Sequence, residues 1–99
     1  MNKQRVGNLL GLAQRAGKII SGEEMVVKAI QEQKAKLVFL AHDAAPNLTK
    51  KIQDKSHYYQ VEVVTVFSTL ELSIAVGKSR KVLAVTDAGF TKKMRSLME

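Results

Sequence analysis

The chain has 99 residues and no cysteine, and its sixteen lysines and arginines against nine acidic residues give a formal net charge of +7. With 45% hydrophobic residues it can bury a core as one domain over residues 1–99, while the lack of cysteine excludes disulfides, thiolate metal sites and cysteine nucleophiles. No run approaches the roughly 20 apolar residues of a membrane helix, and no signal-type segment opens the sequence, so we expect a cytoplasmic protein with no membrane partner.

The first half of the chain is predicted to alternate between helix and strand. Apolar residues at helical spacing predict a helix over residues 3–16, which a short extended piece follows. Ser21 and Glu24 have the spacing of a capping box, which predicts a second helix over residues 21–33. The five apolar residues 37–41 then predict a strand that is buried on both faces.

The second half continues the same alternation. Pro46 suits the start of a third helix, and residues 61–67 are typical of a strand. Residues 68–71 form a second capping box, which opens a short helix that Gly77 closes. Residues 82–86 predict the last strand, and a final helix follows. This order predicts an α/β protein with one sheet covered by helices on both faces.

The positive charge lies in the two flanks of the sequence. Residues 1–36 carry seven basic and three acidic side chains, residues 68–99 carry six and three, and residues 37–67 are neutral. A basic surplus on so short a chain indicates a polyanionic partner, and a solubilising surface is the plain alternative.

Enzymatic sites are poorly supported. His42 and Asp43 follow a predicted buried strand, where α/β proteins often place their sites, but turn chemistry is the favoured interpretation of such a pair. A small-molecule site there stays open as a third hypothesis. The junction at residues 20–24 has one glycine and two carboxylates, which would repel a nucleotide phosphate. With only two histidines and no nucleophile elbow, we expect no catalysis, no metal and no cofactor.

Nucleic acid is the class that remains. The two basic segments are residues 15–18, with Lys28 beyond them, and residues 78–81. If the two segments converge, they form a basic cleft around a helix N-terminus, whose backbone N–H groups can bind phosphate. Glu23 or Glu24 can accept hydrogen bonds from base edges. Aromatic residues are scarce, so structured RNA read by shape is favoured over stacked single strands.

At two places the sequence resembles a known superfamily. The runs 17–30 and 35–46 are similar to the ribosomal protein superfamily that binds RNA kink-turns, and most similar to its small bacterial members. The resemblance implies a three-layer α/β/α sandwich around a four-stranded mixed sheet. It also implies binding to a kink-turn, an internal loop with tandem sheared G·A pairs and a sharp bend.

The resemblance also implies a set of site residues. In the superfamily a glycine and the helix start after it approach the G·A pairs, a lysine one turn later contacts RNA, and the loop before the last strand covers an extruded nucleotide. A further basic position precedes the motif. The matching residues here are Lys18, Gly22, Glu23, Glu24, Met25, Lys28, Gly77, Lys78, Ser79 and Arg80.

Two positions depart from the superfamily pattern. Archaeal members carry Asn-Glu where Glu24 and Met25 stand here, and Met25 cannot accept a hydrogen bond from a guanine edge. Glu24 can substitute only if the capping box does not hold it, so both roles of Glu24 stay open. The loop at residues 78–80 is basic where the superfamily is often apolar, which predicts phosphate contacts and less base-specific binding.

These observations predict a monomeric, ribosomal or ribosome-associated protein that binds rRNA or another kink-turn RNA without catalysis. The alternative is a protein-interaction module of the same fold, whose basic surface docks an acidic partner.

Overall fold

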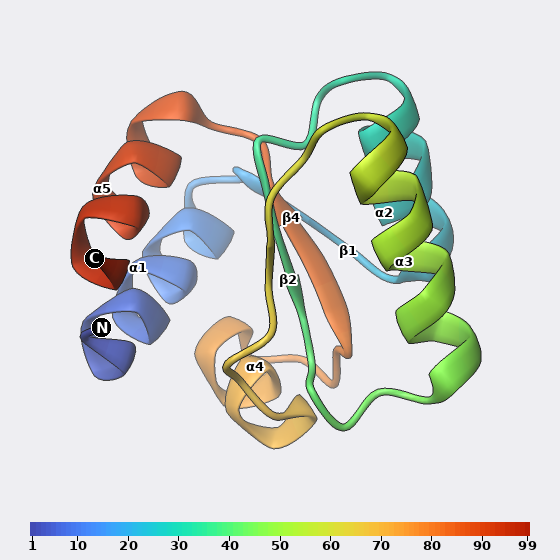
Figure 1. The fold of residues 1–99 in the computed structure, drawn as a ribbon. Coiled ribbons are helices and arrows are strands. Elements are labelled where there is room, and N and C mark those ends of the chain that lie inside the picture. The colour runs from blue at the N-terminus through green and yellow to red at the C-terminus, as the bar shows by residue number, and fades with distance from the viewer.

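The computed structural model describes residues 1–99, and helices alternate with strands along the whole chain (Figure 1). This alternation is the predicted one. The elements are α1 (Lys3–Arg15), β1 (Ile19–Ser21), α2 (Glu23–Gln31), β2 (Leu37–Leu40), α3 (Pro46–Tyr58), β3 (Val63–Val64), α4 (Thr69–Val76), β4 (Val82–Val85) and α5 (Ala88–Met98). No helix is long and apolar enough to span a membrane.

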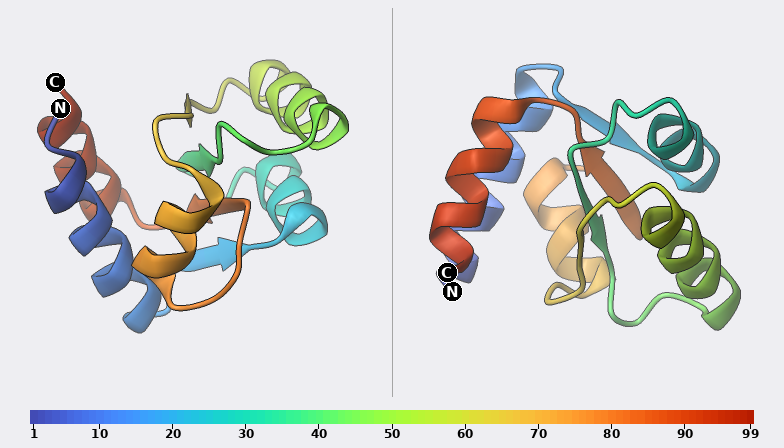
Figure 2. Two further views of the ribbon diagram at one scale, coloured as in Figure 1. Left: turned by 90° about the horizontal axis from the view of Figure 1, so that it is seen from below. Right: turned by 45° about the horizontal axis from the view of Figure 1, so that its top comes forward.

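The four strands form one mixed sheet in the order β1-β4-β2-β3. Strand β4 is antiparallel to both β1 and β2, and β3 is parallel to β2 at the edge. Helices α1, α4 and α5 cover one face, and α2 and α3 cover the other (Figures 1 and 2). The predicted three-layer sandwich with a four-stranded mixed sheet is therefore confirmed.

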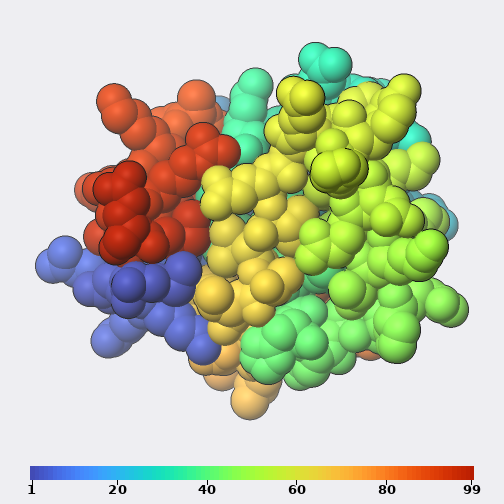
Figure 3. Space-filling model, viewed as in Figure 1, coloured from blue at the N-terminus to red at the C-terminus, as the bar shows by residue number.

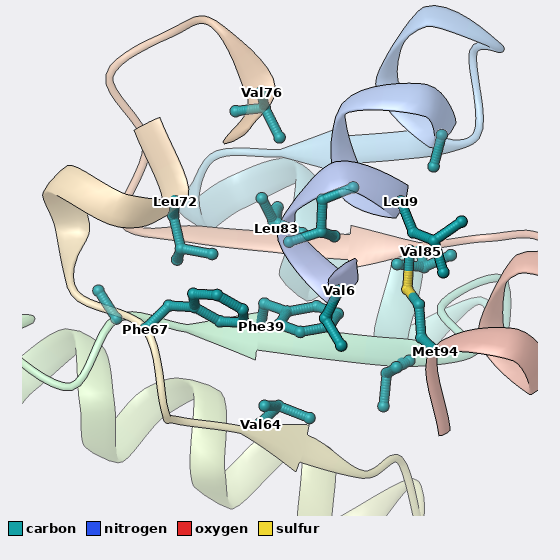
Figure 4. Close-up of a cluster of buried hydrophobic side chains, with 14 residues drawn as sticks. Val6, Leu9, Phe39, Val64, Phe67, Leu72, Val76, Leu83, Val85 and Met94 are labelled. Carbon is teal, nitrogen blue, oxygen red and sulfur yellow. The ribbon is translucent and has the colours of Figure 1, made fainter. Parts of the chain in front are cut away.

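The core consists of two apolar clusters, one on each face of the sheet. Along β2, Leu37 and Phe39 enter the cluster beneath α1, α4 and α5, while Val38 and Leu40 enter the cluster beneath α2 and α3. Successive side chains of a strand point to opposite faces, so a strand covered on both sides must be apolar throughout. Phe39 packs against Phe67 with ring centroids 5.8 Å apart (Figure 4).

The third strand is shorter than the sequence predicts. Only Val63–Val64 pairs with β2, against the predicted 61–67. The residues before β3 remain tied to the end of α3, because the Val61 N–H donates to the Ser56 carbonyl at 2.8 Å. Beyond β3 the chain bends toward α4. Phe67 packs into the core there, whereas Val66 is exposed, so these residues do not extend the strand.

The predicted capping box at the start of α4 is confirmed. The Ser68 hydroxyl accepts from the Glu71 backbone N–H at 3.1 Å, and the Glu71 carboxylate accepts from the Ser68 backbone N–H at 2.9 Å. Gly77 closes this helix in the left-handed conformation with φ of 76°. The cap and the closing glycine fix where the following loop leaves the helix.

Candidate nucleic-acid interface

The start of α2 differs from the expectation. Ser21 lies in β1 opposite Leu83, and the Gly22 N–H extends this ladder by donating to the Val82 carbonyl at 3.1 Å. The chain then turns into the helix at Gly22, whose φ of 95° is rare for residues with a side chain. The predicted capping box between Ser21 and Glu24 is therefore wrong, because strand pairing holds Ser21 one residue before the cap position.

No side chain caps the N-terminus of α2. Side chains cap α1, α4 and α5, whereas Gly22 offers none. The backbone N–H groups of Glu23, Glu24 and Met25 have no acceptor within the protein. Free N–H groups at a helix start carry partial positive charge and bind anions such as phosphate. The start of α2 is thus open to an acceptor from outside the protein.

The two carboxylates at this helix start have different roles. Glu23 Oε2 lies 3.0 Å from Lys51 Nζ, and this ion pair ties α2 to α3. Glu24 has no partner in the protein, and the absence of the capping box leaves its carboxylate free. Met25 is 55% exposed, and Lys28, which lies one turn after Glu24 on the same helix face, is exposed without an ion pair.

The loop between α4 and β4 is anchored at two points. The Arg80 backbone N–H donates to the Ser73 hydroxyl at 3.0 Å, which holds the loop against α4. The Arg80 Nε–H donates to Ser21 Oγ at 2.8 Å, and its Nη1–H donates to the Ser79 carbonyl at 2.8 Å. No carboxylate pairs with Arg80, so its charge stays available. Lys78 and Ser79 are exposed.

The Arg80–Ser21 hydrogen bond joins two segments that are 59 residues apart. Figure 2 (left) shows the loop after α4 passing beside the end of β1, where α2 begins. The structure thereby brings together most of the predicted site residues. We call this the α2–loop surface, and it consists of Gly22, Glu24, Met25, Lys28, Gly77, Lys78, Ser79 and Arg80.

Lys18 lies outside the α2–loop surface. Its carbonyl accepts from the Thr86 N–H at 3.0 Å, which places it beside the far end of β4. Because a strand rises about 3.3 Å per residue, about 10 Å separate Lys18 from Ser21 along β1. The predicted meeting of residues 15–18 with residues 78–81 is therefore wrong. The loop at residues 78–81 instead lies beside Ser21 and Gly22. A role for Lys18 stays a prediction.

Sequence reasoning missed the residues that hold this surface in place. The sequence predicts that Ser21 caps a helix, but Ser21 instead accepts from Arg80, and no sequence pattern points to Ser73 or Lys51. Each of these contacts joins residues on different elements. No local pattern marks them, and only the adjacency of Ser21 to Gly22 offered a signal.

The third hypothesis, a small-molecule site at residues 42–43, finds no support. Asp43 Oδ1 accepts from the Thr69 backbone N–H at 2.9 Å and from the Thr69 hydroxyl at 2.7 Å. These two hydrogen bonds lower the pKa of Asp43 from its ordinary value. The nearby hollow is lined by Asp43, α4 and the loop but not by His42, and no cluster of His, Asp and Glu could hold a metal ion. Asp43 is a structural link to α4.

Known proteins resemble this chain over nearly its whole length. Residues 4–95 match the ribosomal protein L7Ae/L30e/S12e/Gadd45 family. The chain is 49% identical over 98 residues to the RNA-binding protein YlxQ of Enterococcus faecium, covering 99% of this chain and 95% of that protein. It is also 49% identical over 92 residues to the RNA-binding protein YlxQ of Bacillus subtilis, covering 92% of each.

A solved structure shows the same fold. A protein of unknown function from Bacillus halodurans is 43% identical, with a TM-score of 0.90 over 95% of this chain and 96% of that one. The chain therefore belongs to the ribosomal protein L7Ae/L30e/S12e/Gadd45 family. This is a non-catalytic family, so the protein is not an enzyme.

Proposed function

We propose that this protein binds structured RNA through the α2–loop surface and that its target is a kink-turn-like internal loop. The observation that carries the proposal is the uncapped start of α2, which the Arg80–Ser21 hydrogen bond holds beside a basic loop. The YlxQ relatives, which are 49% identical, are described as RNA-binding proteins.

The surface offers groups for both the phosphates and the bases of such an RNA. The free N–H groups of α2, with Lys28 and Lys78, suit phosphate oxygens. The Glu24 carboxylate can accept hydrogen bonds from guanine amino and imino groups, which a sheared G·A pair exposes, while Met25 can only pack against a base. The basic loop at residues 77–80 would cover an extruded nucleotide and contact its phosphate. We therefore expect recognition to depend more on charge than on bases.

The family name also supports a ribosomal setting. The matched family is one of ribosomal proteins, and rRNA offers internal loops of the required kind. We therefore extend the proposal to a ribosomal or ribosome-associated role in the cytoplasm, with rRNA or a separate kink-turn RNA as the partner.

The decisive experiment compares a kink-turn RNA with a straight duplex of matched length at moderate salt. The wild-type protein should bind the kink-turn at least about tenfold more tightly. Lys28→Ala should weaken kink-turn binding and lower the log–log salt slope by about one unit, because one phosphate contact is lost. Arg80→Ala should weaken binding further, since the loop also loses its anchor to Ser21.

The matched control is Lys34→Ala, which removes one lysine beyond the C-terminal end of α2, at the other end of this helix from Gly22. It should leave the affinity nearly unchanged. Equal affinities for the kink-turn and the straight duplex would overturn the kink-turn proposal. An RNA-depleted pull-down that retains a stable acidic protein partner would favour a protein-interaction module instead.

A further inference from the structure

Helices α1 and α5 carry charge of one sign only. Each contains three basic residues and no acidic residue. Lys3 pairs with Glu71 at 2.9 Å and Arg95 pairs with Glu62 at 3.0 Å, both on other elements. The remaining four basic side chains have no ion pair: Arg5, Arg15, Lys92 and Lys93. Solubilising surfaces usually mix both signs, so a helix layer of one sign indicates an anionic partner.

Three surface hollows connect this layer to the α2–loop surface. The first hollow contains Ile74 and Lys78 beside the loop. The second lies between α4 and α1, and it shares Ile74 with the first and contains Leu12 and Arg15. The third lies between α1 and α5, and it shares Leu12 with the second and contains Arg5 and Lys93. We call this series of hollows the basic track.

Apolar side chains lie where the hollows of the basic track meet. Ile74 on α4 is 73% exposed and Leu12 on α1 is 47% exposed. Each hollow also contains at least one basic side chain without an ion pair. The carboxylates along the track are already engaged, Asp43 by Thr69 and Glu71 by Lys3.

Exposed aliphatic side chains with a basic side chain in each hollow suit a single strand that is held by phosphate contacts and by packing of its bases on aliphatic side chains, without aromatic stacking. Unpaired bases present apolar faces, and their phosphates present one negative charge per nucleotide. A duplex would bury its bases and leave Ile74 and Leu12 uncovered. An anionic membrane fits less well, because no aromatic side chain is exposed on α1 or α5 to enter the interface. Figure 3 shows that α5 and the start of α1 form one continuous side of the molecule.

We infer that the basic track binds a single-stranded RNA segment that continues from the RNA held at the α2–loop surface. The inference rests on the proposed function, because the bound internal loop would hold its own flanking strand at high effective concentration beside Lys78. From there the strand would cross α4 at Ile74 and α1 at Leu12 and reach α5 at Lys93. The protein would then contact two parts of one RNA.

The test uses the full chain and three RNAs: the kink-turn with blunt ends, and the same kink-turn with a single-stranded tail of about eight nucleotides on either strand. A tail on one of the two strands should tighten binding by about tenfold. The triple variant Arg5→Gln, Arg15→Gln, Lys93→Gln should lose this gain but bind the blunt RNA as the wild type does. Its salt slope with the tailed RNA should fall by about 2 units, because three contacts to a single strand are lost.

The control variant Lys34→Gln, Lys50→Gln, Lys55→Gln removes the same charge away from the track and should keep the gain. If neither tail tightens binding while the blunt kink-turn is bound, the track inference fails and the proposed function stands. If the blunt kink-turn binds no better than a straight duplex, the proposed function fails. Displacement of the tail by poly-glutamate as efficiently as by single-stranded RNA would overturn the RNA assignment in favour of an acidic protein partner.

Discussion

At the scale of single residues, the site depends on a backbone conformation and on one side-chain contact. Gly22 adopts a φ of 95° and so ends β1 and starts α2 within one residue. Arg80 uses two of its N–H groups within the protein, on Ser21 and Ser79, and keeps the rest for a ligand. The same arginine therefore positions the loop and keeps a charge that no carboxylate neutralises, as the proposed RNA-binding role requires.

Gly22→Ala should destabilise the protein by about 1–2 kcal/mol, because an L-residue at positive φ is strained. A Cβ at this position would meet no atom within 4 Å, so the cost would be conformational and not steric. Urea unfolding measures the change. The control is Gly7→Ala, where the added Cβ also meets open space but the backbone is helical, and this change should stabilise by about 0.5–1 kcal/mol. Equal effects of the two substitutions would contradict this account.

At the scale of elements, α4 connects the core to the loop between α4 and β4, and two carboxylates hold the start of this helix. Glu71 accepts from the Ser68 N–H and pairs with Lys3, and Asp43 accepts from Thr69. The Ser68 N–H lowers the pKa of Glu71 and Thr69 lowers the pKa of Asp43. Both groups therefore favour the folded state while they are ionised. Their contribution is complete above the ordinary carboxyl pKa and is lost as the pH falls through the lowered values.

The melting temperature should therefore fall as the pH decreases below about 4.5, the ordinary value for Glu71. Glu71→Gln keeps a capping-box side chain but cannot titrate, and Asp43→Asn removes the second titration. The double variant should have a flatter melting curve against pH, as measured by circular dichroism. Glu99→Gln, at an exposed residue without a partner, serves as the control. A double variant that loses stability in acid in parallel with the wild type would contradict the assignment.

At the scale of the whole molecule, the free energy of unfolding of so small a domain depends on its two apolar core clusters. Domains of this size are stable by about 5–15 kcal/mol, and truncating a buried phenylalanine to alanine costs about 3–5 kcal/mol. Phe39 is fully buried at the centre of the larger cluster and packs on Phe67 (Figure 4). Phe39→Ala should lower the unfolding free energy by that amount in urea, whereas Tyr58→Ala, at an exposed ring, should change it by less than about 0.5 kcal/mol. Similar losses for both would show that the cluster is not the main source of stability.

Much of the fold could be predicted from local patterns. The apolar run at 37–40 reveals a strand covered on both faces, because only burial on both sides removes the alternation of polar and apolar residues. Ser68, Glu71 and Gly77 mark the ends of α4, since a capping box and a left-handed glycine are local in sequence. The resemblance of residues 17–30 and 35–46 to the superfamily predicted the site residues, and the Arg80–Ser21 hydrogen bond places the loop before β4 beside the start of α2. Whether these residues bind RNA stays a prediction.

Only the tertiary structure decided where these residues lie and which residues they contact. Ser21 fits a capping box by its spacing, but pairing with Leu83 keeps it in β1, where it accepts from Arg80. Lys18 stands four residues before Gly22 and yet lies at the other end of β1. The basic track exists because the two ends of the chain meet, where the Asn2 N–H donates to the Leu97 carbonyl at 2.8 Å. The sequence by itself determined the elements and the charge, since both depend on neighbouring residues. Which charges share a surface depends on contacts between distant residues, and no local pattern encodes those contacts.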